Sequence, residues 1–395
     1  MQLLAKQFFF EAFMKDVYIT RTSSYLPNAP VGNSDIESVI GRLKKQPERV
    51  KQFVLANNGI QTRYYAIDPK TGRKTHSNAQ LASESVTALL RDAGLKLEQI
   101  EGLACGTSSA DQLIPSHANM VAGELGMPPA EIVSTAGVCA SGMSAFKYAY
   151  MDVALGHARN FIVTGSECAS AFMEVKQYEP LIDALHADPD AVPMVAFEKE
   201  FLRWMLSDGA GAVLLEPAPR VGAVNFKVES VALRSWAGSL PVCMYAGMNK
   251  SKDGDLTFWF DEDDRSQIPQ KGYLLLQQDA RVLEAHMVDV AVQGLTYLIE
   301  EQGFDVDRVD WFLPHLSSMY FKDVLMEQFE ANGVKLPEKK WFTNLADKGN
   351  TGSASIFIML DELARSGRLQ NGETVFCAVP ESARFTMAGM LLTVC

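Results

Sequence analysis

Long apolar runs, clustered cysteines and an excess of positive charge are all missing from this sequence, and each absence excludes a class of protein. No run approaches the eighteen or more apolar residues that a membrane span requires, so we expect no membrane span. The 48 Asp and Glu residues outnumber the 36 Lys and Arg residues, giving a net charge of −12. Because nucleic-acid binding needs clustered cations that neutralise phosphates, this balance argues against a nucleic-acid partner.

The six cysteines are too scattered to form a disulfide or metal framework. No C-x-x-C pair occurs among them, and the His residues share no metal-ligand spacing. A chain of 395 residues can bury a large core without disulfides. We therefore predict reduced thiols, a cytoplasmic location, no metal and no redox cofactor. The stretch 1–14 has an apolar patch but no small-residue cleavage site, so we expect no signal peptide and regard Met14 as a candidate natural start.

An internal repeat runs through the chain. Segments 100–109 and 309–318 each read as an apolar strand followed by a polar loop that ends in Ser-Ser. Segments 139–156 and 350–367 align without a gap, with Phe at the eighth position and Gly at the eighteenth, as at a helix C-terminus. The two offsets, 209 and 211 residues, are nearly equal. Such constancy indicates a duplicated structural unit.

Each copy alternates strand, helix and strand, and the strands are mostly apolar. This pattern predicts an α/β fold with mostly parallel sheets covered by helices. We expect an internally duplicated structure of two halves, residues 14–215 and 216–395, with a site between them. The duplication places Cys139 and Asn350 at equivalent positions, each before an apolar helix, and His315 at the end of a strand. These three side chains are therefore expected to meet.

The three residue types suit thioester chemistry. A thiol at a helix N-terminus experiences the positive end of the helix dipole, which should lower the pKa of Cys139 and favour the thiolate. His315 and Asn350 can both donate hydrogen bonds to one developing oxyanion. Taken singly, a buried Cys or His is usually structural and an Asn at a helix start is usually a cap. Their joint occurrence at duplicated positions favours a catalytic role.

Five motifs resemble those of the thiolase-fold condensing enzymes, and most closely those of the β-ketoacyl-acyl-carrier-protein synthase III group. The resemblance covers nearly the whole chain from Val17 to Val394. The motifs are NNGIQTRYY at 57–65, AGVCASG at 136–142, SDGAGAVLL at 207–215, LPHLSS at 313–318 and KGNTGSAS at 348–355. The resemblance implies the thiolase fold, with αβαβα layers, and an acyltransferase that condenses two thioesters.

The resemblance also implies a role for individual residues. Cys139 would carry the acyl group, and His315 with Asn350 would bind the carbonyl of the second thioester and support its enolate. The backbone amides of Cys139 and Ala383 would form the oxyanion hole. The resemblance further implies a homodimer that takes its substrates from acyl carrier protein or coenzyme A. Ile114 would then cap the acyl tunnel of the partner subunit, where a bulky Phe is common in the family.

Departures from the family pattern bear on the subfamily. The segment PESARFT at 380–386 replaces a glycine-rich turn, which puts the second oxyanion donor in doubt. Phe53 and Asn57 stand where the family often has a Trp and an Arg that grip coenzyme A. Several segments resemble the branch that makes cyclohexanediones for dialkylresorcinol and flexirubin-type lipids. That branch would join a β-ketoacyl thioester to an α,β-unsaturated acyl thioester and close a ring.

Other readings stay open at this stage. A conventional synthase III that uses malonyl-carrier protein, and an acyl transferase or thioester hydrolase, would use the same Cys and His. A catalytically silent partner subunit would typically lack the nucleophile, but Cys139 is intact. Glu167 ends a strand near the expected site and is a candidate tunnel residue or base, although a structural hydrogen bond is at least as common for such a residue.

Overall fold

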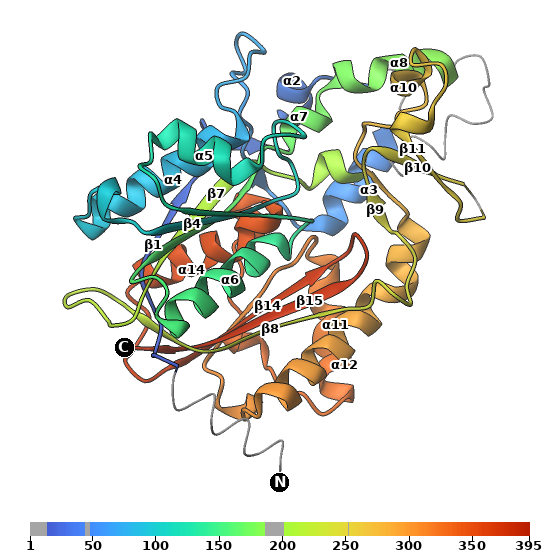
Figure 1. The fold of residues 1–395 in the computed structure, drawn as a ribbon. Coiled ribbons are helices and arrows are strands. Elements are labelled where there is room, and N and C mark those ends of the chain that lie inside the picture. Colours follow the sequence, from blue (N-terminus) through green and yellow to red (C-terminus); the bar gives the residue numbers. More distant parts are fainter. Residues whose placement is uncertain (1–13, 44–47, 186–200, 252) are drawn as a thin grey trace.

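A computed structural model describes residues 14–43, 48–185, 201–251 and 253–395 of the chain (Figure 1). Its centre is a nine-stranded sheet with strand order β13-β14-β15-β8-β1-β7-β6-β4-β5. The strands of the first half are β1 (Tyr18–Tyr25), β4 (Gly102–Thr107), β5 (Glu131–Ala136), β6 (Phe161–Glu167) and β7 (Gly209–Glu216). Those of the second half are β8 (Phe226–Ser235), β13 (Trp311–Pro314), β14 (Thr374–Glu381) and β15 (Thr386–Val394).

Apart from the edge strand β5, the two halves of the sheet have the same topology. In the first half, β4 is parallel to β5 and β6, and β7 runs antiparallel to both β6 and β1. In the second half, β13 is parallel to β14, and β15 runs antiparallel to both β14 and β8. The halves join where β1 pairs with β8 over a short antiparallel register. The prediction of a duplicated α/β fold with mostly parallel strands is thus confirmed.

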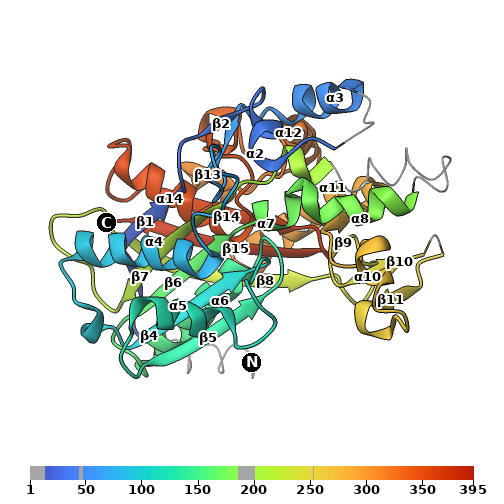
Figure 2. The same cartoon turned by 90° about the horizontal axis from the view of Figure 1, so that it is seen from above.

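Helices and sheet halves alternate in five layers, as Figures 1 and 2 show from two directions. Helices α4 (Asn78–Ala93) and α5 (His117–Leu125) cover the outer face of the first half. Helices α11 (Ala280–Gln302) and α12 (Tyr320–Ala331) cover the outer face of the second half. Between the halves lie α6 (Ser141–Leu155) and α14 (Ser355–Arg365), packed together through Phe146 and Phe357. The αβαβα arrangement expected from the sequence is present.

Shorter elements surround this core. They are β2 (Val31–Gly32), β3 (Thr62–Arg63), β9 (Met244–Tyr245), β10 (Met248–Lys250), β11 (Leu256–Phe258), β12 (Gln277–Gln278), α2 (Ile36–Ile40), α3 (Glu48–Asn58), α7 (Ser170–Met173), α8 (Val175–Leu185), α10 (Gln267–Gln270) and α13 (Leu345–Lys348). Among the described helices, α11 alone is long and apolar enough to cross a membrane by length and composition. Its buried residues pack on the sheet, as expected of a core helix.

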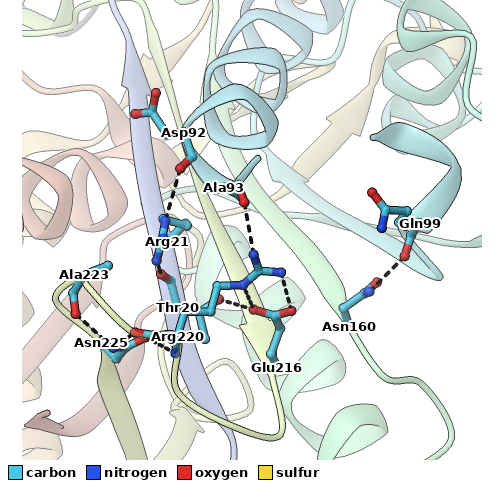
Figure 3. Close-up of polar contacts among 10 residues, drawn as sticks. All are labelled: Thr20, Arg21, Asp92, Ala93, Gln99, Asn160, Glu216, Arg220, Ala223 and Asn225. Carbon is cyan, nitrogen blue, oxygen red and sulfur yellow. Dashed lines mark hydrogen bonds and ion pairs between the residues drawn. The ribbon is translucent and has the colours of Figure 1, made fainter. Parts of the chain in front are cut away.

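Polar contacts fix the end of α4 to the sheet (Figure 3). The last carbonyls of a helix lack intrahelical partners and carry partial negative charge. Arg21 of β1 donates to the Asp92 carbonyl at 3.3 Å, and Arg220 donates to the Ala93 carbonyl at 3.0 Å. Arg220 also forms two hydrogen bonds with the Glu216 carboxylate at the end of β7. These cationic partners hold the outer helix layer in place.

The repeat predicted from the sequence is visible in the two central helices. Gly156 ends α6 in the left-handed conformation, with φ of 76°. In the second copy Ser366 occupies the cap of α14, and Gly367, with φ of 68°, follows it. The strands expected after each helix are β6 and β14. A 3₁₀ turn, Gly352–Ala354, intervenes between Asn350 and α14, so Asn350 stands farther from its helix than Cys139 does from α6.

Close backbone approach brings that turn against the first half. A Cβ atom added to Gly165 of β6 would lie 2.2 Å from the Ser353 carbonyl oxygen, and one added to Gly142 of α6 would lie 2.5 Å from the same atom. Both clashes involve backbone, which a rotamer change cannot relieve. The missing side chains therefore allow the segment that carries Asn350 to sit beside the start of the Cys139 helix.

We predict that Gly165→Ala lowers the free energy of unfolding by about 1–3 kcal/mol, because the added methyl group overpacks the junction of the two halves. Gly123→Ala in α5 is the matched control. No atom lies within 4 Å of its added Cβ, and replacing a helical Gly should stabilise the chain by about 0.5–1 kcal/mol. Urea denaturation of both variants measures the difference. Equal effects would contradict the close approach described above.

Candidate active site

Cys139 lies in the short connection between β5 and α6. The helix begins at Ser141, and the Ser141 amide donates to the Val138 carbonyl at 2.9 Å. The side chain of Cys139 is 7% exposed and belongs to the central hydrophobic cluster between the sheet halves. The thiol is therefore close to a helix N-terminus, as expected, but in an apolar setting.

The apolar setting decides the protonation state of this thiol. Burial, followed by the Glu381 and Glu167 carboxylates, raises the pKa of Cys139 above its usual range. A helix N-terminus stabilises a nearby anion by about 0.3–2 kcal/mol, whereas burial can shift a pKa by up to about 3–5 units. The sequence-based expectation of a lowered pKa is wrong for this chain, because desolvation outweighs the dipole. The free chain holds Cys139 as a neutral thiol at neutral pH.

His315 directly follows β13 and is 2% exposed. Its backbone amide donates to the Ala378 carbonyl at 2.8 Å, which continues the pairing of β13 with β14. Neither ring nitrogen has a hydrogen-bond partner among the residues that the structure describes. Burial lowers the pKa of His315 to about 4, so the ring is neutral at physiological pH. A neutral imidazole offers one N–H donor and one acceptor nitrogen, both of which are free here for a substrate.

Asn350 is held by its backbone and by one end of its side chain. Its amide donates to the Met205 carbonyl at 3.0 Å, and its carbonyl accepts from the Ser207 amide at 2.8 Å. The side-chain oxygen Oδ1 accepts from the Gly352 amide at 2.9 Å. This contact fixes the orientation of the amide group, so that Nδ2 remains available as a donor.

Cys139 shares a small chamber with each of the other two residues. Cys139 and Asn350 line one chamber, and Cys139 and His315 line the other. We name them the Asn350 chamber and the His315 chamber. The Asn350 chamber has a volume of about 60 Å³ and an otherwise mainly apolar wall that includes Met205 and Met244. The structure thus places Cys139 in one cavity with Asn350 and in another with His315, and the meeting of all three side chains stays a prediction.

Glu167 also lines the Asn350 chamber, but its carboxylate is fully engaged. It accepts hydrogen bonds from the Ser108 hydroxyl at 2.6 Å, from the Ser109 hydroxyl at 2.6 Å and from the Ser353 amide at 3.2 Å. Burial raises the pKa of Glu167 in spite of these donors. The contacts tie the end of β6 to the turn before α14, which is the structural role that the sequence left open.

The other two predicted site residues, Ala383 and Ile114, do not contribute free groups to the chambers of this chain. The Ala383 amide donates to the Glu381 carboxylate, so it is engaged within its own turn and does not offer a free N–H to an oxyanion. Ile114 is 86% exposed and lies outside both chambers of this chain. Its predicted role as a cap for a partner subunit stays a prediction.

Comparison with known families agrees with this geometry. The family model for the C-terminal part of 3-oxoacyl-[acyl-carrier-protein (ACP)] synthase III matches residues 299–394, and the thiolase N-terminal domain matches residues 61–198. The chain is 26% identical to β-ketoacyl-[acyl-carrier-protein] synthase III of Cereibacter sphaeroides over 349 residues, which cover 88% of this chain and 90% of that one. The chain is a thiolase-fold condensing enzyme. It is similar to synthase III, an acyl-transferring enzyme type.

Solved structures share the fold of this condensing enzyme. The tetronic acid condensing enzyme AbyA1 superimposes with a TM-score of 0.75 at 23% identity, covering 95% of this chain and 99% of that one. An OleA variant from Xanthomonas campestris gives a TM-score of 0.73 at 18% identity, with coverage of 96% and 99%. At these identities the likeness concerns the fold alone.

Sequence reasoning missed several residues that line the chambers of the condensing enzyme. Ser317 and Ser382 contribute to both chambers, and Gln278 contributes to the Asn350 chamber. Gln278 lies in β12, far from any of the quoted motifs. Two signals were available: Ser317 falls within the quoted motif LPHLSS, and Ser382 falls within PESARFT, the segment that replaces the glycine-rich turn. No metal-binding group of three or more His, Cys, Asp or Glu occurs within residues 14–43, 48–185, 201–251 and 253–395.

The raised pKa of Cys139 leads to a pH prediction for the condensing enzyme. Because the thiol stays protonated at neutral pH, its alkylation by iodoacetamide should become about tenfold faster per pH unit from pH 6 to pH 9, without a plateau. Peptide mapping by mass spectrometry follows the modification of Cys139 specifically. A plateau below pH 8 would show that the helix N-terminus prevails over burial.

Proposed function

We propose that this condensing enzyme joins two acyl thioesters by a two-step Claisen-type reaction through an acyl group on Cys139. The single observation that carries the proposal is the position of Cys139 at the wall shared by the two chambers. A thiol in that position can receive an acyl group and present it to a second thioester bound beside it. Asn350 Nδ2 and the His315 ring, which have no hydrogen-bond partners among the described residues, would then face the reacting groups.

In the first step, the sulfur of Cys139 attacks the carbonyl carbon of the donor thioester, and the carrier thiol leaves. Because Cys139 is neutral beforehand, its proton needs an acceptor. The free ring nitrogen of His315 can take this proton and pass it to the departing thiolate. A histidine whose pKa lies near 4 holds a proton only briefly, which suits a transfer role.

In the second step, the carbonyl oxygen of the extender thioester accepts hydrogen bonds from Asn350 Nδ2 and from His315. These donors stabilise the enolate that forms when the adjacent carbon loses a proton, or loses CO₂ in the case of a malonyl thioester. The enolate carbon attacks the acyl group on Cys139, a carbon–carbon bond forms, and the bond from the acyl carbon to sulfur breaks. The Cys139 thiolate then takes up the proton that the extender lost, or a proton from solvent after loss of CO₂, and is a neutral thiol again. The fixed orientation of Asn350 means that little reorganisation is needed when the charge develops.

Our proposal for the substrates is a β-ketoacyl thioester and a second, α,β-unsaturated acyl thioester, which would give a cyclohexanedione precursor of dialkylresorcinols. Two features of the sequence support this proposal. Several segments resemble the branch that makes dialkylresorcinol precursors, and the 380–386 turn, Phe53 and Asn57 depart from the usual synthase III pattern. A conventional synthase III reaction with malonyl-carrier protein is the second candidate, and the similarity to synthase III relatives favours it. An acyl transferase or thioester hydrolase with the same residues is the third.

One experiment separates these candidates. The acylated enzyme is supplied either with a β-ketoacyl thioester or with malonyl thioester labelled in its free carboxylate. The proposal expects a condensed product from the β-ketoacyl thioester and no release of labelled CO₂ from malonyl thioester. Labelled CO₂ with a β-ketoacyl product would establish the conventional reaction, and release of free acid alone would establish hydrolysis.

We propose that the substrates arrive on a carrier protein rather than on coenzyme A. A separate cavity of about 450 Å³ lies between α3, α11 and α12, and Phe321 lines both this cavity and the His315 chamber. Phe53 and Asn57 line the 450 Å³ cavity, and Glu284 is the only charged residue among the described residues that do so. Among these described residues, a coenzyme A nucleotide with its phosphates would find no cation. Comparing kcat/KM for acyl-carrier protein and acyl-coenzyme A tests this choice.

We also propose a homodimer. Leu113 and Ile114 are both strongly exposed at 81% and 86%, and they precede α5 at the edge of the first half. Two adjacent exposed aliphatic side chains of this size suit burial against a second copy. Light scattering coupled to size-exclusion chromatography would give the mass of the assembly directly.

A further inference from the structure

Three described residues line both chambers: Cys139, Ser317 and Ser382. Ser382 belongs to the turn between β14 and β15, where the sequence has PESARFT instead of a glycine-rich segment. A side chain that lines both chambers beside Cys139 is placed to contact the carbonyl group that reacts with the thiol. The contacts of this turn show which of its groups can do so.

The backbone of the neighbouring residue, Ala383, is occupied. Its amide donates to the Glu381 carboxylate, and its carbonyl accepts from the Cys243 amide at 2.8 Å and the Met244 amide at 3.2 Å. Glu381 is 5% exposed, so this carboxylate is a buried anchor rather than a surface contact. The turn is thereby fixed from both sides, and the Ala383 amide is directed toward Glu381.

The Ser382 hydroxyl, by contrast, donates to no other residue in the part of the chain that the structure describes. Its oxygen accepts a hydrogen bond from Nε2 of Gln278 at 3.2 Å, and Gln278 is 4% exposed in β12. Because one lone pair accepts from Gln278, the hydroxyl hydrogen is oriented away from that side chain and is available to donate. Ser108 and Ser109 in the same chamber differ, since their hydroxyls donate to Glu167. Ser317 differs in another way, because no described side chain orients its hydroxyl as Gln278 orients that of Ser382.

We propose that the Ser382 hydroxyl, oriented by Gln278, is the side-chain donor that stabilises the oxyanion formed on the acyl carbonyl at Cys139. This inference rests on the proposed function. As the Cys139 sulfur bonds to the thioester carbon, the carbonyl π pair moves onto oxygen, and Ser382 donates a hydrogen bond to that oxygen. When the intermediate collapses, the carbonyl forms again, the carrier sulfur leaves with the proton that Cys139 gave up, and Ser382 keeps its own proton. A hydroxyl thus fills the place for which the sequence suggested the Ala383 amide.

The test compares two reactions of the same thiol. Acylation of Cys139 by an acyl thioester passes through an oxyanion, whereas alkylation by iodoacetamide is a displacement at a saturated carbon and does not. Loss of one oxyanion donor typically costs 10²–10³-fold in rate. Ser382→Ala should therefore slow single-turnover acylation by about 100-fold and leave alkylation within about twofold of the wild type. Ser382→Thr, which retains a hydroxyl, should keep most of the acylation rate.

Ser317→Ala tests the other hydroxyl that lines both chambers, and it should slow acylation less than Ser382→Ala does. Ser239→Ala is the control for the substitution itself, because Ser239 is exposed and lines neither chamber, so it should leave acylation unchanged. The proposal is overturned if Ser382→Ala acylates at the wild-type rate, if it slows acylation and alkylation equally, or if Ser317→Ala shows the larger selective loss. A wild-type enzyme that no thioester acylates, while iodoacetamide still modifies Cys139, would instead overturn the proposed function on which the inference rests.

Discussion

Replacing Cys139 with Ala is expected to lower the rate of product formation by on the order of 10⁴-fold or more, because no acyl-enzyme can form. The side chain is buried at the wall of both chambers, so its sulfur is placed to reach a substrate bound in either. The substitution removes only one sulfur atom from a well-packed site, and the chain should remain folded. Product formation is measured with saturating thioesters, and folding is checked by circular dichroism.

Cys395→Ala provides the matched control for this prediction. Cys395 is a free, partly exposed thiol at the end of the chain, and it lies outside both chambers. Its replacement should leave activity unchanged. A Cys139→Ala enzyme that retains a tenth of the wild-type activity would mean that another group carries out the reaction.

Changing Asn350 to Asp should separate the two half-reactions. The Asp side chain can still accept from the Gly352 amide as Asn350 Oδ1 does, so the local backbone is preserved. It lacks the Nδ2 donor and brings a negative charge toward the enolate. Condensation should fall by about 10³-fold, the upper range for loss of one oxyanion donor. Acylation of Cys139 should fall much less, because Asn350 does not act in that step.

His315→Ala provides the contrast. In the proposed mechanism His315 accepts the Cys139 proton and later donates to the extender carbonyl, so both half-reactions should slow in this variant. Acylation is followed by intact-protein mass spectrometry and condensation by product analysis. An Asn350→Asp enzyme with normal condensation, or one in which acylation falls as much as condensation, would contradict the division of roles.

The duplicated fold could be predicted from the sequence for a physical reason, and the same repeat led to the prediction that Cys139, His315 and Asn350 meet. Equivalent residues of a repeat occupy equivalent places in the two halves. The position of Cys139 before one central helix therefore indicates that Asn350 precedes the equivalent helix of the other half. The helix C-terminus at Gly156 and the strands β6 and β14 follow from local patterns of the same kind. Local sequence carries this information because turns and helix ends depend on neighbouring residues.

The pKa of Cys139 and the role of the 380–386 turn could not be obtained in the same way. Burial of Cys139 results from packing between two sheet halves, and the carboxylates that raise its pKa come from distant segments. The contact between Gln278 and Ser382 joins residues more than a hundred positions apart, with no motif to mark it. The engagement of the Ala383 amide by Glu381 depends on the detailed path of one turn.

Intact-protein mass spectrometry, after incubation of the enzyme with acyl-carrier protein and acyl-coenzyme A thioesters, tests the central claim most directly. The account predicts a mass increase equal to one acyl group, located on Cys139 by peptide mapping and absent from the Cys139→Ala variant. The absence of any adduct from every donor, with Cys139 still open to alkylation, would contradict a condensing reaction through this thiol and would favour a catalytically silent partner subunit.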